Sequence, residues 1–328
     1  MLVKGLESKW KAGRLFKGRE PTDHKWRMCE ARMMLGDFSD WEGWQYRDPW
    51  SAGLWHNPLI DGVKPWDGLR VGHLYIIGEQ GVGDEVFFGQ CLPACLALAD
   101  KVTFEGDPRL IPALTRMGVQ EVISSNYVDV GNDRKRTMLT IKADAWMPLG
   151  DLPRVFCRLK GVRPPFAVNY LTADPEQARK YENYKGRIGL SWRGAQGHYK
   201  AKDFASLAGQ KALSLQYDQS ALEPVERPAL DLREDFEGLL GLLSNVEKVI
   251  TVSTTVAHLA CALGVKTELI LAPLNGRHRN LLPFRWGQGH GKPSSWYPSS
   301  VVYSGLNEYL AMNRRVNERS HQLSQARV

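Results

Sequence analysis

The chain has 328 residues, of which 43% are hydrophobic and 24% are charged. This composition is typical of a globular protein and excludes a disordered or collagen-like chain, and the length predicts two domains of about 150 residues each. No run approaches the roughly 18 apolar residues that a membrane-spanning helix needs, and no apolar block follows the basic start of the chain. We therefore expect a cytoplasmic protein without a transmembrane segment.

The charge balance is basic, with 43 Lys and Arg against 36 Asp and Glu and a net charge of +7. Such an excess is compatible with nucleic acid, anionic lipid or a phosphorylated small molecule as a partner. Much of it lies near the two ends of the chain, as solvated termini would also explain. The five cysteines have neither CxxC spacing nor a histidine at zinc-finger spacing, so we expect no disulfide framework and no structural metal.

Residues 1–69 predict an N-terminal region that differs from the rest of the chain. Residues 24–47 carry apolar side chains at helical spacing on both sides of a Gly-Asp break, which predicts two short antiparallel helices. Residues 48–70 are rich in Trp, Pro and Gly and have no periodicity. This composition is typical of a connecting loop that its aromatic side chains hold in place.

Residues 70–183 alternate between strand and helix patterns. The sequence from Leu69 predicts a strand, a glycine-rich turn and an apolar-faced helix, and the segments KVTFEG, PRLIPALTRMG and EVISS predict a strand, a helix and a strand. Alternation of this kind is typical of a parallel sheet. We expect a doubly wound, Rossmann-like domain over these residues.

A second alternating series, from GRIGLSW to TELILAP, contains four strand patterns separated by helical ones. It predicts a second Rossmann-like domain over residues 184–305, after the hydrophilic boundary segment TADPEQARKYENYKG. Residues 306–328 have a weak helical pattern that turns polar, which predicts a C-terminal helix and a polar tail. Two facing α/β domains would place a ligand cleft at the carboxyl ends of their strands.

The first candidate site is the glycine-rich turn from Gly78 to Asp84, which joins a strand to a helix. Its glycines would let a ligand approach the backbone at the start of the helix. The turn is not a Rossmann fingerprint, because position 86 is Val, and it lacks the GK[ST] of a P-loop. A tight turn with Asp84 as the N-cap of the helix is the alternative interpretation.

The second candidate site follows the strand at residues 248–252. Ser253, Thr254 and Thr255 lie at the start of a helix, and His258 lies in its first turn. Hydroxyl groups and free backbone N–H groups at a helix N-terminus suit an anionic diphosphate. Ordinary capping by Ser and Thr, with His258 packed in the core, explains the motif as well.

The third candidate site is the loop after the first strand of residues 184–305. Arg193 lies in the motif SWRG, and His198, Lys200 and Lys202 follow it. Cations at the carboxyl end of a strand could clamp phosphate oxygens, Arg193 with a planar fork and the lysines as point charges. Loop cations that face only solvent are the alternative.

Five motifs occur in an order that resembles that of a known protein family. GEQGVGDEVFFGQCLP, SWRG, LQY, VSTTVAHLACALG and SSWYP follow one another between Gly78 and Pro298, and the resemblance as a whole spans residues 24 to about 300. This order resembles bacterial and phage glycosyltransferases found behind tetratricopeptide repeats, which are similar to the lipopolysaccharide heptosyltransferases of glycosyltransferase family 9. The resemblance implies a GT-B fold with an N-terminal acceptor domain and a C-terminal donor domain. It also implies inverting transfer from a nucleotide-diphosphate sugar to a glycan, protein or small-molecule hydroxyl, without a metal or another cofactor.

On this resemblance, Asp84 matches the family's candidate general base, and a carboxylate can take the proton of the attacking hydroxyl. The helix N-terminus with Thr254 and Thr255, and cations such as Arg193, would stabilise the leaving diphosphate. Gln216 and residues 273–279 are placed to contact the base and ribose. The expected donor-binding residues are Arg193, Lys200, Lys202, Gln216, Ser253, Thr254, Thr255 and His258, and the expected acceptor-side loop contains Glu79, Gln80, Gly81 and Gly83.

Two alternative functions remain open. The heptosyltransferase motif has Asp-Thr-Gly where this chain has Ser253-Thr254-Thr255, which puts ADP-heptose in doubt as the donor and motivates a catalytically degenerate module that binds a nucleotide or a partner. The basic termini and the tryptophan-rich loop suit a DNA-modifying glycosyltransferase that acts on a hydroxylated base. Loop packing explains the tryptophans as well.

Overall fold

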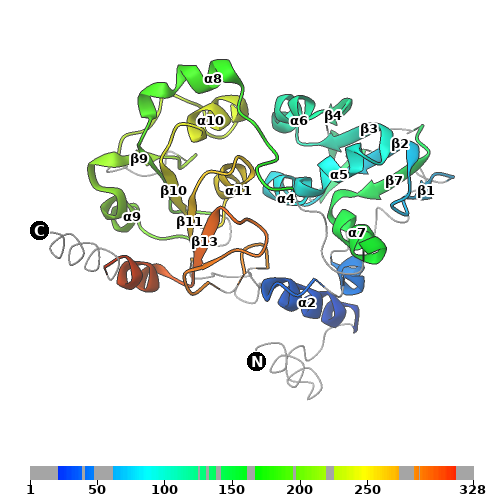
Figure 1. Cartoon of the computed structure of the whole chain (residues 1–328), viewed down its shortest axis with the longest axis horizontal. Helices are drawn as coiled ribbons and strands as arrows, with labels where there is room; N and C mark the ends of the chain where they lie inside the picture. The colour runs from blue at the N-terminus through cyan, green and yellow to red at the C-terminus, as the bar shows by residue number, and fades with distance from the viewer. Residues whose placement is uncertain are drawn as a thin grey trace, which may run out of the picture. The chain divides into compact units, whose positions relative to one another are not determined.

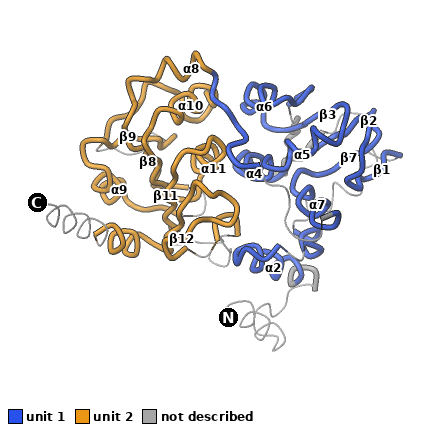
Figure 2. The backbone as a smooth tube through the Cα atoms, in the orientation of Figure 1, with its two compact units in different colours: residues 1–174 blue, residues 175–328 orange. Residues whose placement is uncertain are grey.

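The computed structural model describes residues 21–38, 41–47, 62–124, 126–130, 133–137, 142–160, 167–194, 197–218, 225–272, 284–287 and 289–314. The chain divides into two compact units, Met1–Asp174 and Pro175–Val328 (Figure 2). Each unit contains a sheet of mainly parallel strands with helices (Figure 1), so the predicted α/β class is confirmed. Most of the predicted connecting loop, residues 48–61, and residues 315–328 of the predicted tail lie outside the described residues.

Unit 1 begins with two helical segments that pack on each other. The helix α2 spans Pro21–Met34, and the 3-10 helix η1 spans Glu42–Tyr46. They approach closely because Gly43 has no side chain, and a Cβ there would collide with the Lys25 carbonyl oxygen. Where the spacing predicts two α-helices, the second segment is a five-residue 3-10 helix.

The main sheet of unit 1 has the strand order β1-β7-β2-β3-β4, and all of its neighbouring pairs are parallel. Its strands are β1 (Lys64–Pro65), β2 (Val71–Ile77), β3 (Ala99–Gly106), β4 (Glu121–Ser124) and β7 (Ala145–Pro148). The three predicted strands correspond to β2, β3 and β4, and the structure adds β1 and β7. A separate antiparallel hairpin contains β5 (Asn126–Val130) and β6 (Asp133–Thr137).

The other helices of unit 1 follow the carboxyl ends of its strands. They are α4 (Val82–Phe88), η3 (Gly89–Cys91), α5 (Leu92–Leu96), η4 (Pro108–Leu110), α6 (Ile111–Met117), η5 (Leu149–Asp151) and α7 (Leu152–Lys160). The sequence predicts one helix after β2, but η3 separates α4 from α5, and Pro93 lacks the N–H that a continuous helix would use. The predicted helix at PRLIPALTRMG ends at Gly118 in the left-handed conformation, with φ 107°.

Unit 2 contains a six-stranded sheet with the order β12-β13-β11-β10-β8-β9, in which only β12 is antiparallel to its neighbour. The strands are β8 (Ile188–Ser191), β9 (Ala212–Ser214), β10 (Lys248–Thr251), β11 (Thr267–Ile270), β12 (Lys292–Pro293) and β13 (Ser300–Tyr303). The helices are α8 (Pro175–Lys180), η6 (Glu182–Tyr184), α9 (Ala201–Ala208), η7 (Gly209–Lys211), α10 (Phe236–Leu243) and α11 (Thr255–Ala262). The predicted alternation from β8 to β11 is confirmed.

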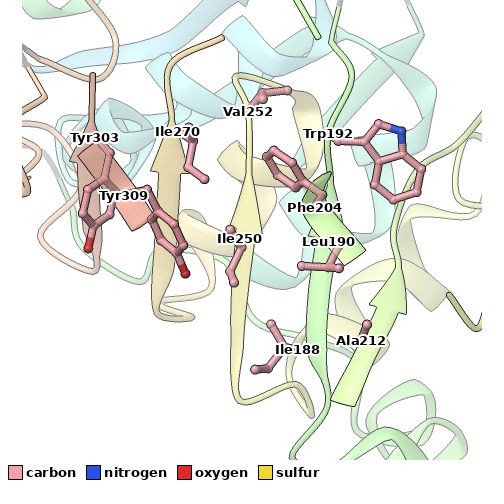
Figure 3. Packing of buried hydrophobic residues seen from close by; sticks show 10 residues of the cluster. All are labelled: Ile188, Leu190, Trp192, Phe204, Ala212, Ile250, Val252, Ile270, Tyr303 and Tyr309. Atoms are coloured by element: carbon pink, nitrogen blue, oxygen red, sulfur yellow. The ribbon is translucent and has the colours of Figure 1, made fainter. Parts of the chain in front are cut away.

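One face of the unit 2 sheet carries a continuous apolar cluster (Figure 3). It comprises Ile188, Leu190, Trp192, Phe204, Ala212, Ile250, Val252, Ile270, Tyr303 and Tyr309. Residues 306–314 are helical and contribute Tyr309 to the cluster, with Leu306 and Leu310 packed against it. The helix after β13 therefore covers the core of its own unit. In the described segments, none of the helices combines the length and apolar character needed to cross a bilayer.

The boundary between the units comes before α8, because α8 packs on α10. A Cβ at Gly241 in α10 would lie 2.6 Å from the backbone of Gln177, and the Asn245 side chain donates a hydrogen bond to the Ala178 carbonyl at 2.7 Å. The boundary expected from the hydrophilic segment, residue 183, lies after α8 and within η6. The hydrophilic sequence there is the exposed surface of a helix that belongs to unit 2.

Candidate functional site

In unit 2, the segment after β10 forms the N-terminus of α11. Thr254 is the N-cap residue, with extended backbone angles, and its Oγ1 accepts a hydrogen bond from the Ala257 N–H at 3.3 Å. The same oxygen lies 3.2 Å from Thr251 Oγ1. Capping therefore accounts for Thr254, while the N-terminus of α11 keeps the partial positive charge that favours an anion.

Ser253 and His258 are held by two aromatic side chains, Trp286 and Tyr297. The His258 ring stacks on Trp286 with centroids 4.4 Å apart, and His258 Nδ1 lies 3.0 Å from the Tyr297 hydroxyl. The Trp286 indole N–H donates to Ser253 Oγ at 2.9 Å. Burial, and then the charge of Arg285, lowers the pKa of His258 well below its usual value. His258 is thus a packed, neutral residue, as its alternative interpretation predicts.

The loop after β8 lies directly against the start of α11, because β8 and β10 are neighbouring strands. A Cβ at Gly194 would collide with the Ser253 carbonyl oxygen, so only glycine permits this approach. Arg193 forms an isolated bridge with His198 across the loop, and Arg193 Nη1 lies 3.2 Å from Asp218 Oδ2. The Arg193 side chain is 54% exposed. The structure therefore brings Arg193 and the Ser253–Thr255 segment to one edge of the sheet.

The buried Gln216 side chain hydrogen-bonds the backbone of this loop and does not face a ligand. It is completely buried, and its Oε1 accepts the Arg193 N–H at 3.0 Å while its Nε2 donates to the Arg193 carbonyl at 3.2 Å. Both ends of the amide are thus occupied by backbone. The expected contact of Gln216 with the base and ribose does not fit this position, because the buried amide instead fixes the conformation at Arg193.

Lys200 and Lys202 lie at the start of α9. Lys200 is the N-cap residue, Lys202 lies in the first turn, and both side chains are exposed. Because α9 follows the loop after β8, its N-terminus lies at the same edge of the sheet as Arg193. The expected segment of the donor site at residues 273–279 lies outside the described residues.

In unit 1, the glycine-rich turn places Asp84 in the first turn of α4. The N-cap residue is Gly81, with φ −133° and ψ 165°, so Asp84 is the third residue of the helix and not its N-cap. Gly83 lies between them in the first turn, and Gln80 has a left-handed backbone with φ 65°. The capping interpretation of Asp84 is therefore wrong: the glycine turn itself starts the helix, and the Asp84 side chain is half-buried.

The carboxylates on either side of Asp84 are both buried. Glu79 is 1% exposed and accepts two hydrogen bonds from Arg47 Nη2, at 2.7 and 2.8 Å. Glu85 accepts the Asp107 N–H at 2.8 Å. Burial raises the pKa of Glu79, and the charge of Arg47 opposes this shift. Of the acidic residues in 78–85, Asp84 alone has an accessible side chain, and Glu79 supports the turn instead of facing an acceptor.

Five cysteines carry thiols that take part in no disulfide in the structure: Cys29, Cys91, Cys95, Cys157 and Cys261. Burial raises the pKa of Cys157 and of Cys261 to about 12, so these thiols are protonated at neutral pH. Over the described part of the chain, no group of three or more His, Cys, Asp or Glu residues is arranged to hold a metal ion.

Several supporting residues of these sites are absent from the sequence-based prediction. Tyr297 lies in the motif SSWYP, which marked the family resemblance but carried no assigned role, and Trp286 lies eight residues before that motif. Arg47 and Asp151 have no local signal at all, because the hydrogen bonds of Arg47 reach 32 and 104 residues along the chain. Such partners become visible only once the sheet brings its loops together.

The comparisons with known proteins show the fold. No family model and no curated protein matches the sequence. A solved glycosyl transferase family 9 structure from Veillonella parvula is similar, with a TM-score of 0.53 and 12% identity over 76% of this chain and 90% of that one. The ADP-heptose lipopolysaccharide heptosyltransferase II of Escherichia coli gives a TM-score of 0.42 and 12% identity over 76% and 99%.

A third solved structure, the iron-containing dodecameric glycosyltransferase TibC from enterotoxigenic Escherichia coli, gives a TM-score of 0.40 and 13% identity over 74% of this chain and 68% of that one. The similarity to the Veillonella protein establishes a shared α/β fold. At 12% identity, this similarity extends to the fold alone.

Proposed function

We propose that the chain is an inverting glycosyltransferase that moves a sugar from a nucleotide-diphosphate sugar to an acceptor hydroxyl. The observation that carries this proposal is the close approach of the Arg193 loop to the N-terminus of α11, which depends on Gly194. A helix N-terminus beside an exposed guanidinium suits a diphosphate, since backbone N–H groups and a planar cation both bind phosphate oxygens. The family 9 fold supports the same class of reaction.

Ser253 adds a hydrogen-bond donor to this donor site. The Trp286 indole can only donate, so Ser253 Oγ is the acceptor in their 2.9 Å hydrogen bond. The hydroxyl hydrogen of Ser253 is then free to turn toward another acceptor, such as a phosphate oxygen. Thr255 and Lys202 at the two helix starts supply further contacts to the charge that develops on the leaving diphosphate.

Asp84 is the general base of the proposed reaction. Its carboxylate takes the proton of the acceptor hydroxyl while the hydroxyl oxygen forms a bond to the anomeric carbon. The bond from that carbon to the diphosphate breaks at the same time, which inverts the configuration. Glu79 and Glu85 are held in buried contacts, which supports Asp84 as the carboxylate that meets the acceptor.

The proposal also covers the acceptor, the cellular compartment and the N-terminal helices. The acceptor is a glycan, a protein or a small molecule, the reaction takes place in the cytoplasm, and the N-terminal helical segment corresponds to the last of a series of tetratricopeptide repeats. The reaction needs neither a metal nor another cofactor, because the helix N-termini and cations neutralise the diphosphate. Activity that persists in excess EDTA is the expected result, and its loss, with recovery on adding a divalent metal, would refute this part.

A thermal-shift screen tests the donor site. Nucleotides ADP, UDP, GDP, CMP and dTDP and their sugar conjugates are added in turn, since a ligand of the native state raises the melting temperature. We expect a shift with one nucleotide that is lost in Arg193→Ala. Lys211→Ala is the matched control, because Lys211 forms an exposed ion pair with Glu247 at 2.9 Å, at the amino edge of the same sheet. No shift, or a shift that Arg193→Ala retains, would contradict the proposal.

A further inference from the structure

Unit 1 contains a buried network of two arginines and two carboxylates. Arg47 Nη2 donates to Glu79 at 2.7 and 2.8 Å and to Asp151 at 3.1 Å, and Arg154 Nε donates to Asp151 at 3.1 Å. Arg47, Glu79 and Asp151 are at most 1% exposed, and Arg154 is 7% exposed. Two positive and two negative charges balance, so the network as a whole is neutral.

The network joins three segments that are far apart in sequence. Glu79 follows β2, and Asp151 lies in η5 after β7, the strand that pairs with β2 through Ile77 and Pro148. Arg47 is the C-cap residue of η1, in the N-terminal helical segment. Gly150 lets the segments close up, because a Cβ there would collide with Glu79 Oε1. The network therefore lies at the carboxyl edge of the sheet, where the turn of Asp84 begins.

The turn that carries Asp84 is anchored at both ends by buried carboxylates. Glu79 is the first anchor, through Arg47, and Glu85 is the second, through the Asp107 N–H. Gln80, directly after the first anchor, has a left-handed backbone with φ 65°, which a residue with a side chain adopts only where the surrounding structure holds it. Arg47 therefore contacts the residue that begins the turn, and Asp84 lies between this residue and the second anchor.

We propose that Arg47 is a positioning residue, which through Glu79 fixes the turn that carries the base Asp84. Residues 41–47 then complete the acceptor side of the catalytic machinery, although they precede the α/β sheet in sequence. This inference rests on the proposed function of Asp84. It means that residues 41–47 affect the rate of the reaction. A displacement of about 1 Å at a reacting group is enough to slow a reaction about a hundredfold.

A comparison of Arg47→Lys with a surface variant tests whether Arg47 positions the turn of Asp84 or only stabilises the fold. Lysine keeps the charge but loses the planar fork that reaches both carboxylates. Arg158→Lys is the matched control, because Arg158 grips Glu42 of the same η1 with two hydrogen bonds, at 2.6 and 2.7 Å, but is 56% exposed. The double variant Arg47→Met with Glu79→Met removes one charge of each sign and leaves the Asp151–Arg154 pair intact, which guards against simple failure to fold.

Two measurements on the full chain give the readout. Amide hydrogen exchange at residues 80–85 should become at least about tenfold faster in Arg47→Lys and in the double variant, and stay unchanged in Arg158→Lys. With the donor found by the thermal-shift screen, kcat should fall at least about tenfold in the same two variants, with the donor KM unchanged and the acidic limb of the pH profile displaced.

The outcomes distinguish this inference from the proposed function. Unchanged exchange at residues 80–85 in Arg47→Lys overturns the inference, whether or not turnover has been observed. Equal kcat and equal pH profiles in Arg47→Lys and Arg158→Lys overturn it too. If Asp84→Asn turns over like the native chain, the base assignment fails, whereas an inactive Asp84→Asn beside fully active Arg47 variants removes only the role of Arg47.

Discussion

The N-terminus of α4 in unit 1 and the N-terminus of α11 in unit 2 occupy similar places in their sheets, but different kinds of contact hold them in position. Each helix begins at the carboxyl edge of a parallel sheet, directly after a buried strand. At α11 the supporting contacts are neutral, from Trp286, Tyr297 and the amide of Gln216. At α4 they are ionic, from Arg47 and Asp151. Because the supporting contacts differ in charge, we expect the two helix N-termini to suit ligand groups of different charge.

At α11 the positive end of the helix lies beside Arg193, whose side chain is 54% exposed although it pairs with Asp218, and this combination favours an anion. At α4, Glu79 is paired with Arg47 in the buried network. Asp84 is then the acidic residue of the turn whose side chain is accessible. In the proposed reaction, the edge at α11 binds the diphosphate and the edge at α4 accepts the proton. The two helix N-termini should therefore respond differently to substitution.

The largest effect is expected for Asp84→Asn. Loss of a general base slows a reaction by about a hundred- to ten-thousandfold, and we expect turnover to fall in this range. The fold should persist, because the half-buried side chain stays similar in size. Release of nucleotide from the matched sugar donor measures the effect, and Glu176→Gln, an exposed acid in the first turn of α8, is the control. Native-like turnover in Asp84→Asn would exclude it as the base.

The next effect is on stability, in Arg47→Met. Removal of one partner of a buried ion pair costs about 3–5 kcal/mol, because the remaining charges stay buried without compensation. Glu79 would then be buried beside Asp151 with only Arg154 to balance them. Urea unfolding measures the loss, and the double variant with Glu79→Met should recover much of it. Arg158→Met should cost no more than about 1 kcal/mol, because its ion pair is exposed; equal losses would contradict the network.

The same contrast explains how much the sequence could predict. The strands and helices from β8 to β11 follow from apolar runs and helical spacing, because a buried strand and a one-sided helix leave local patterns. The strand β7 leaves almost none: it has four residues and pairs with β2, about 70 residues earlier in the chain. Local patterns therefore predict individual strands but not their order in the sheet.

The candidate site was predictable at the level of segments and less so at the level of side chains. The motifs correctly marked the turn at Gly78–Asp84 and the loop at Arg193 as ends of parallel strands. Glu79 and Gln216 lie in those segments, yet their side chains turn inward, to Arg47 and to the Arg193 backbone. Whether a polar side chain faces a ligand or a neighbouring loop depends on contacts distant in sequence, which a local motif does not contain.

A smaller effect is expected from the pH dependence of stability that His258 confers. Its pKa is depressed in the folded state and close to 6.5 in the unfolded chain. Its contribution is therefore fully present above pH 6.5 and is lost as the pH falls below that value, by up to about 1.4 kcal/mol per pH unit. Urea unfolding between pH 7.5 and 5 measures the slope. His258→Phe should flatten it, whereas the exposed His290→Gln should not; a slope that survives His258→Phe contradicts the buried neutral state.

The smallest effect is expected for Thr254→Ala, which removes the N-cap of α11. Loss of a capping hydroxyl costs about 1 kcal/mol, while Thr254→Ser keeps the oxygen that accepts the Ala257 N–H. The backbone N–H groups that would face a diphosphate remain, so the nucleotide thermal shift should persist in both variants, on a lower baseline in Thr254→Ala. Loss of the shift in Thr254→Ala, at an unchanged unfolding free energy, would mean that the hydroxyl binds the ligand directly. The neutral supports of α11 would then be only part of what makes this edge bind an anion.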